Sequence, residues 1–364
     1  MTQLSAAQRI PRSRPRLRST WLYRPGTDLL IAWSWLPFYA VTALVASAGT
    51  ADAVVVAILG WVLAISLLHQ PLTLLLVYGD SGQFRAHRRL FVWGPIVAVG
   101  LIGATAVLGL WVLVLPIAAA WQVFHTQQQR YGLLRIYGRK AGYGSPRLDR
   151  AMCYLPLAAV TALVVALPAA SDQLHRFAAG IGSDNASKLD QLFAARGTIL
   201  LLLVPLVVAA LVAVGLYLRQ ERAACRAGEA NPAKWNYLLA SAALLAGLVV
   251  NPVAGLVAYV AAHALEYILV VDRTLAARYG RSSPPSSLLG VLAGTTVRRN
   301  LLLAGFFLVL ALVNVELRGT IPATAYLVII YVVGLLHFGY DAVIWKARRP
   351  AVAAEFGVRP AAPG

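Results

Sequence analysis

Long apolar runs separated by short polar segments repeat along the whole chain of 364 residues. A helix that crosses the hydrocarbon core of a bilayer needs about 20 mostly apolar residues. By this criterion the pattern predicts about ten transmembrane helices in an all-α polytopic bundle. The predicted spans are residues 28–48, 53–78, 90–109, 111–131, 152–170, 197–218, 235–250, 253–272, 299–315 and 324–345.

Two pairs of predicted helices are joined without a polar loop, near Leu110 and at Asn251-Pro252. Either pair is alternatively one broken or re-entrant element, which would reduce the count to eight or nine. The composition agrees with a membrane protein, because hydrophobic residues make up 59% of the chain and charged residues only 13%. The apolar runs extend over the full length, so we expect one membrane domain rather than a soluble domain with an anchor.

The net charge of +18 is distributed in a way that predicts the topology. Basic residues gather in every second loop and at both ends, which is the positive-inside pattern for a chain whose two termini are cytoplasmic. This pattern also accounts for the charge without nucleic-acid binding, which we do not expect. The prevalence of Arg over Lys is typical of a GC-rich bacterial genome, so the expected location is the bacterial cytoplasmic (inner) membrane.

Three regions follow from this topology. Residues 1–27 contain six arginines and are expected to form a basic cytoplasmic arm that lies on anionic headgroups. Residues 28–346 form the transmembrane domain. Residues 347–364 are rich in Ala, Pro and Arg and are expected to be a frayed, disordered cytoplasmic tail.

Four histidines interrupt the apolar runs: His69, His125, His263 and His337, each in a different predicted helix. An imidazole in hydrocarbon is costly and usually has a function and a partner. All four helices run toward the cytoplasm in the ten-span topology, which places the histidines roughly 8–17 Å from that boundary. A single shared metal site is therefore predicted. One structural imidazole between helices is the simpler explanation for any one of them, but not for four at one depth.

Polar side chains follow these histidines at helical spacing, where residues three and four apart share a face. Glu266 and Asp341 are the expected catalytic carboxylates, which either accept the second N–H of a metal-bound imidazole or bind metal themselves in a two-metal cluster. Thr73 shares a helix face with His69 in the same way. The other expected neighbours of the site are Gln128, Gln129, Tyr267 and Tyr340.

The donor types restrict the metal. Imidazole with carboxylate suits iron, zinc or manganese, and the chain has only two cysteines, which disfavours a soft metal held by thiolate. We expect iron, with zinc or manganese as alternatives. His87 and His175 lie in polar loops and are expected to be solvated surface residues.

Lone histidines on several membrane helices resemble the pattern of the bacterial β-carotene 15,15′-dioxygenase family. The resemblance covers only His69, His125, His263 and His337, without a contiguous motif, and this chain has more spans than that family is expected to have. It implies a non-haem iron oxygenase in the membrane, with a lipidic or isoprenoid substrate and lipids as its surroundings. The clustered His-x-x-His-His boxes of membrane desaturases and hydroxylases are missing from the sequence, which disfavours those families.

Two other functions fit the same residues. In a proton- or ion-coupled transporter, the histidines with Glu266 and Asp341 would form a relay. In a b-type haem protein, two of the histidines on different helices would clamp one haem. The discriminating observation is convergence, because metal bonds near 2 Å require the four imidazoles to meet at one point.

Overall fold

The computed structural model describes residues 20–47, 52–181, 196–280, 287–346 and 349–358, and every regular element in these ranges is a helix. The helices in chain order are α1 (Pro25–Trp33), α2 (Leu36–Ser47), α3 (Asp52–His69), α4 (Pro71–Tyr78), α5 (Ser81–Ala86), α6 (Arg88–Val107), α7 (Trp111–Ala141), α8 (Pro146–Ala166), α9 (Pro168–Ile181), α11 (Arg196–Ala227), α12 (Pro232–Val250), α13 (Pro252–Tyr279), α14 (Leu288–Ala293), α15 (Thr296–Thr320), α16 (Ala323–Ile344) and α17 (Pro350–Glu355).

Nine helical stretches in the described ranges are long and apolar enough to cross a membrane, as in an integral membrane protein. Nine of the ten predicted spans correspond to them. The remaining predicted span, 111–131, lies within α7, a 31-residue helix that is not among the nine. The predicted break at Asn251-Pro252 is confirmed, because Asn251 ends α12 and its side chain accepts the N–H of Ala254 at the start of α13.

Two of the predicted spans are interrupted helices. Span 28–48 is divided into α1 and α2 around Ser34, and span 53–78 is divided into α3 and α4 at Gln70-Pro71. Proline has no N–H to donate to the helical hydrogen-bond ladder, although Gln70 before it keeps helical backbone angles. The second break therefore follows His69 directly, so that α3 ends on a candidate site residue.

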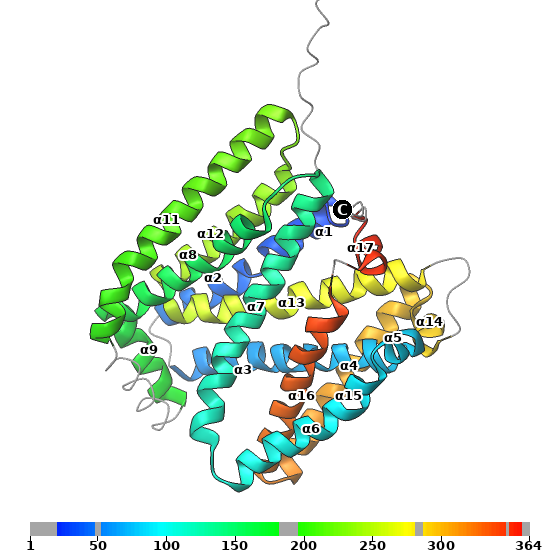
Figure 1. Ribbon diagram of the computed structural model, residues 1–364. Helices are drawn as coiled ribbons and strands as arrows, with labels where there is room; N and C mark the ends of the chain where they lie inside the picture. The colour runs from blue at the N-terminus through cyan, green and yellow to red at the C-terminus, as the bar shows by residue number, and fades with distance from the viewer. Residues whose placement is uncertain (1–19, 48–51, 182–195, 281–286, 347–348, 359–364) are drawn as a thin grey trace, which may run out of the picture.

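Helix α13 is the centre of the bundle, since 72% of its apolar window is buried. Figure 1 shows α13 and α3 crossing the middle of the molecule, with α8, α11 and α12 on one side and α6, α15 and α16 on the other. Helix α7 passes in front of both central helices and α16 lies beside it. The four helices that carry the candidate histidines thus surround one region of the core.

The tail does not fray throughout, contrary to our expectation for residues 347–364. Residues 350–355 form α17, after which Phe356 and Val358 are buried against the core beside Leu22 and Tyr137. Apolar burial thus holds this segment in place. The remaining parts of the predicted arm and tail, residues 1–19, 347–348 and 359–364, lie outside the described residues.

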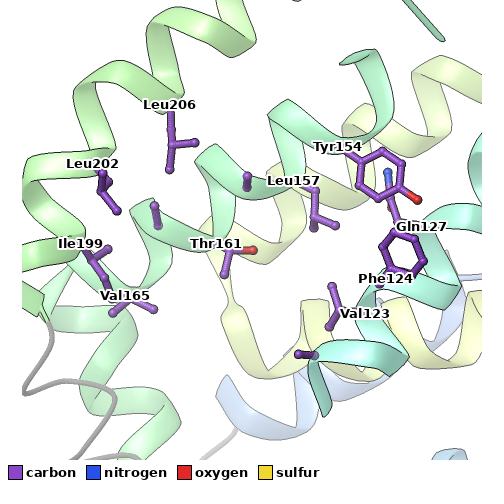
Figure 2. A pocket seen from close by; sticks show the side chains of 13 residues that line it. Val123, Phe124, Gln127, Tyr154, Leu157, Thr161, Val165, Ile199, Leu202 and Leu206 are labelled. Carbon is purple, nitrogen blue, oxygen red and sulfur yellow. The ribbon is translucent and has the colours of Figure 1, made fainter. Parts of the chain in front are cut away.

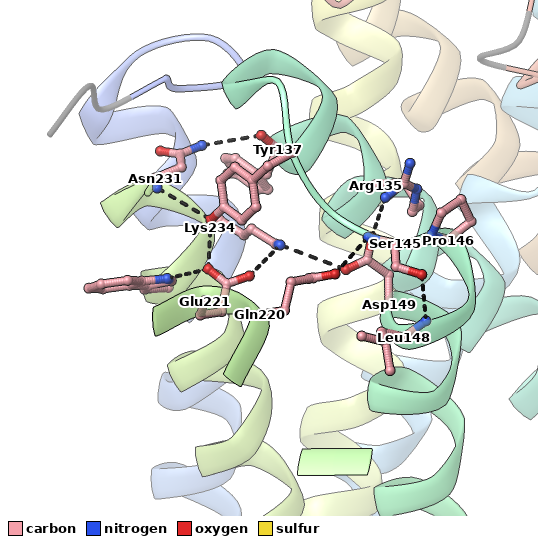
Figure 3. Close-up of polar contacts among 12 residues, drawn as sticks. Arg135, Tyr137, Ser145, Pro146, Leu148, Asp149, Gln220, Glu221, Asn231 and Lys234 are labelled. Carbon is pink, nitrogen blue, oxygen red and sulfur yellow. Dashed lines mark hydrogen bonds and ion pairs between the residues drawn. The ribbon is translucent and has the colours of Figure 1, made fainter. Parts of the chain in front are cut away.

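A buried cluster of charged groups joins α7, α8, α11 and α12 at one end of the bundle (Figure 3). Lys234, which is fully buried, lies 2.7 Å from Glu221 Oε1 and 3.7 Å from Asp149 Oδ1. Asp149 is also paired with Arg135 on α7, and Tyr143 donates its hydroxyl to Glu221. Two cations meet two carboxylates here, so the cluster is neutral as a unit.

Candidate metal centre

The four predicted histidines converge. Their rings form a closed circuit in the order His69, His263, His125, His337, with successive centroid separations of 4.8, 5.2, 4.8 and 5.0 Å. An imidazole nitrogen bound about 2 Å from one ion would place neighbouring centroids about 4.5–5.3 Å apart, for bond angles near about 90–110°. The observed spacings fall within this range. Four rings from four helices thus lie at the spacing expected for ligands of one metal ion, and the ligand atoms of His69, His263 and His337 lie within 4.8 Å of one another.

Each helix delivers its histidine for a local reason. His69 is the last residue of α3, and the break at Pro71 ends that helix in the core. His263 lies in the middle of α13, the most buried helix, while His125 and His337 come from α7 and α16 on the face that Figure 1 shows in front. Three of the rings are fully buried, and only His125 keeps some exposure, at 12%.

Most of the ring nitrogens in this cluster have no hydrogen-bond partner. Both nitrogens of His69 and His263, together with Nε2 of His125 and of His337, are buried and unpaired. An unpaired buried polar atom costs about 1–3 kcal/mol, so one cluster with six of them needs an explanation. Metal coordination would satisfy one nitrogen of each ring. The donor set therefore fits a metal ion.

The hydroxyl of Thr73 fixes the orientation of His337. Thr73 Oγ1 donates to Asp341 Oδ1 at 2.8 Å and lies 2.7 Å from His337 Nδ1. Since its single proton goes to the carboxylate, the hydroxyl accepts from His337 Nδ1–H, and the lone pair of that ring is on Nε2. Tyr267 donates to the same carboxylate oxygen at 2.9 Å and packs against His69 and His337.

The hydrogen bonds of Thr73 limit which atoms of two candidate ligand groups are available to a metal. Ligand atoms of His69, His263 and His337 lie within 4.8 Å of one another, as do those of His125, His337 and Asp341. The two groups share His337, whose Nδ1 is already bonded to Thr73, so only its Nε2 is available to a metal. The other oxygen of Asp341 lies 3.8 Å from His125 Nε2. Asp341 thus lies beside the ring cluster and accepts hydrogen bonds from Thr73 and Tyr267 rather than from an imidazole, so its two predicted roles stay predictions.

Glu266, the second predicted carboxylate, is engaged elsewhere. Its Oε1 is 2.8 Å from Arg130 Nη2, and its Oε2 accepts from Gln129. Gln129 also donates to the main-chain oxygen of His263, which links this ion pair to the cluster through the backbone. Both charged groups are buried, and Glu266 belongs to neither candidate ligand group among the described residues.

Arg130 is the partner that the sequence did not indicate. It lies in the core, with its guanidinium about 6 Å from the rings of Tyr237 and Tyr259. The available signal was its spacing of five residues from His125 on the same predicted helix, about 7.5 Å along the axis, which keeps Arg130 close to the histidine layer.

Two of the predicted neighbours lie away from the cluster. Gln128 accepts a hydrogen bond from Tyr154 on the exposed side of α7. Tyr340 packs on Phe91 and contacts the hydroxyl of Tyr78. Counted from His337, residue i+3 of α16 therefore faces α6, whereas residue i+4, Asp341, faces the histidines. Gln128 and Tyr340 therefore make these contacts away from the histidine cluster.

The two remaining histidines do not join the cluster. His87 lies between α5 and α6, and burial, followed by the charges of Arg349 and Lys346, lowers its pKa. His175 lies on α9. A cavity of about 480 Å³ between α7, α8 and α11 is also separate, since it is lined almost wholly by apolar side chains and by none of the four histidines (Figure 2).

Together the fold and the site define an integral membrane helix bundle with a buried centre of four histidines. Comparison of the chain with family models, with curated proteins and with solved structures finds no match. The functional argument therefore depends on the geometry of the site alone.

Proposed function

We propose that the protein is a membrane metalloprotein whose ion is bound by His69, His125, His263 and His337, and that it is a non-haem iron oxygenase acting on a lipidic or isoprenoid substrate. The observation that carries the proposal is the closed circuit of four rings 4.8–5.2 Å apart with six unpaired buried nitrogens. Imidazole ligands without thiolate suit iron, with zinc and manganese as alternatives. Bound iron would supply the redox chemistry with dioxygen.

The surroundings support this assignment over the other two. A porphyrin between two axial imidazoles needs a slot between their helices, whereas these four rings contact one another directly. A relay for transport would use Glu266, but that carboxylate is neutralised by Arg130. The apolar helices around the centre favour a substrate dissolved in the bilayer. The proposal includes ten spans with cytoplasmic termini in a bacterial inner membrane, from the loop charges.

Metal analysis tests the centre. The protein purified in detergent is expected to contain about one transition-metal ion per chain, with iron predominant, by mass spectrometry of the elements. Replacing His69, His263 or His337 by Asn should remove most of the metal. The matched controls H87N and H175N should retain it, because these two side chains lie outside the cluster. Thermal unfolding of each variant shows whether it remains folded.

The outcomes separate the parts of the proposal. Folded cluster variants that bind as much metal as H87N would refute the centre. Bound iron without consumption of dioxygen in the presence of β-carotene and other isoprenoid polyenes would leave the centre standing and remove the oxygenase. An intense visible Soret absorption would show bound haem, and the non-haem proposal would be replaced by the haem alternative.

A further inference from the structure

The exposed side of the centre is confined to one direction. His69, His263 and His337 have no exposed surface, whereas His125 keeps 12% and the neighbouring Asp341 keeps 6%. These two side chains lie 3.8 Å apart, so the exposed parts of the site belong to the same edge. Elsewhere Tyr267 packs against the rings of His69 and His337, and Gln129, which donates to Glu266, also donates to the main-chain oxygen of His263. A molecule that reaches the ion without displacing the core must therefore approach beside His125.

Two apolar stripes lead to this edge. On α7, Ile117 and Trp121 are 65% and 49% exposed and precede His125 at intervals of four residues, so that the three share one face. On α16, the exposed Leu335, Gly339 and Ala342 lie on one face, with the half-buried Phe338 beside them.

The two stripes meet at the centre. The ring of Phe338 is 4.7 Å from that of His125 and 5.6 Å from that of His337. From Ile117 to His125 the stripe extends about 12 Å along α7 at the helical rise. Since both helices belong to the apolar bundle, these exposed faces are in contact with hydrocarbon rather than water.

We propose that an elongated apolar chain, of the isoprenoid or acyl type, enters from the bilayer between α7 and α16, lies along the stripe from Ile117 to His125, and is positioned by Phe338. This proposal rests on the metal function above and adds its substrate route and a specificity-determining residue. Phe338 sits where a chain would have to pass to reach the imidazoles, so the size of its side chain sets which atom of the substrate meets the ion.

A glycine pair in the chain gives a matched test of this route. Gly339 on α16 and Gly305 on α15 are both exposed helical glycines with open space around a built Cβ. Replacement of either by Leu should be tolerated and should favour the helix to a similar extent. Only G339L places a bulky side chain next to Phe338, on the proposed path.

The experiment uses the full-length protein in phosphatidylcholine vesicles with a long-chain fatty acid that carries a diazirine at its end. We expect photolabelling of residues 117–125 and 335–342 above that of α15, competed by unlabelled β-carotene. G339L should lower this labelling by about tenfold, as expected for bulk placed in a fitted apolar path, and G305L should leave it unchanged. Metal content is measured in the same samples.

The result that overturns the proposal is labelling of α7 and α16 no higher than that of α15, or an equal response to G339L and G305L. If the wild-type protein retains its metal in that case, the entry route fails while the metal function stands. If the wild type holds no metal, the function itself has failed.

A second variant, F338A, should keep the metal and shift the site of labelling toward His125. If F338A leaves the labelled positions unchanged, Phe338 does not position the chain.

Discussion

At the scale of single residues, the centre depends on how each imidazole is held as much as on which residues are histidines. Around His337, Thr73 and Tyr267 both donate to Asp341, at 2.8 and 2.9 Å, and Thr73 accepts from His337 Nδ1–H at 2.7 Å. Hydrogen bonds of this kind fix the tautomer and the orientation of a ligand ring, and their loss typically lowers metal affinity by about 10–100-fold. Thr73 is the hub, because it contacts the other three groups.

Replacing Thr73 by Val tests this role with almost no change in shape. His337 Nδ1–H would lose its acceptor and Asp341 would lose one of two donors, so we expect metal affinity to fall by about 10–100-fold. The measurement is a titration against a chelator of known affinity. Thr73→Ser, which keeps the hydroxyl, should restore binding close to that of the wild type. Equal affinity in the Val and Ser variants would show that the network does not orient the ligand.

Replacing Glu266 distinguishes a structural ion pair from a catalytic carboxylate. Glu266→Gln should leave the buried charge of Arg130 uncompensated and destabilise the protein by about 3–5 kcal/mol. The double variant E266Q/R130Q should recover part of this loss, as followed by thermal unfolding. We expect both to retain metal when folded, since Glu266 is not in a candidate ligand group. Metal loss in a folded E266Q protein would instead make Glu266 a ligand.

At the scale of elements, the apolar runs were sufficient to predict the nine helical stretches of the described ranges that are long and apolar enough to cross a membrane, and to place one histidine on each of four helices. A run of about 20 apolar residues has one stable state in hydrocarbon, so the spans follow from composition. The break after His69 is also visible in the sequence, as Pro71. These features are local, and each is determined by a few consecutive residues.

The orientation of the neighbours could not be predicted in the same way. Asp341 and Tyr340 follow His337 by four and three residues, and either spacing permits a shared face. Packing of α16 against α6 determines which of these two residues faces the histidines, because it places Tyr340 against Phe91. The pairing of Glu266 with Arg130 likewise joins residues 136 positions apart. Such contacts depend on which helices are adjacent, which a single sequence does not show.

The turn between α4 and α5 gives a prediction on pH. Asp80 accepts the N–H groups of Gly82 and Gln83, and also contacts Tyr279 and Arg278. Burial raises the pKa of Asp80, but the hydrogen bonds from these groups and the charge of Arg278 outweigh it and hold the pKa below its usual value. The stabilisation is therefore complete above a pH of about 4 and is lost as the pH falls through the lowered pKa.

Asp80→Asn should accordingly lower stability by about 1 kcal/mol at neutral pH, because Asn caps a helix about as well as Asp but loses the charge that faces Arg278 and Tyr279, in a partly exposed setting. The difference in melting temperature between wild type and D80N should stay constant from neutral pH down to about 5 and shrink progressively as the pH falls below about 4 through the lowered pKa of Asp80. Thermal unfolding over this pH range measures it. A difference that persists in acid would show that the charge of Asp80 is not responsible.

At the scale of the whole molecule, two polar centres lie in one apolar bundle and differ in how their polar atoms are satisfied. In the cluster around Lys234, each charged side chain faces an opposite charge within the protein. In the histidine cluster six ring nitrogens have no partner within it. A protein interior tolerates the first arrangement as structure, whereas the second requires a ligand. The difference in pairing identifies the functional centre, although both clusters are buried.

Replacing Lys234 by Met tests this division of roles. The variant leaves Glu221 and Asp149 with only one cation, Arg135, between them, so a buried negative charge becomes uncompensated and the free energy of unfolding should fall by about 3–5 kcal/mol. Adding Glu221→Gln in the same chain restores neutrality and should recover part of that loss. Metal bound per folded protein should be unchanged in both variants, because no residue of this cluster is in a candidate ligand group. Thermal unfolding gives the first quantity and elemental analysis of the folded fraction the second. A folded K234M protein without metal would mean that the two centres are coupled through α7 and α12, against the separation inferred from their pairing.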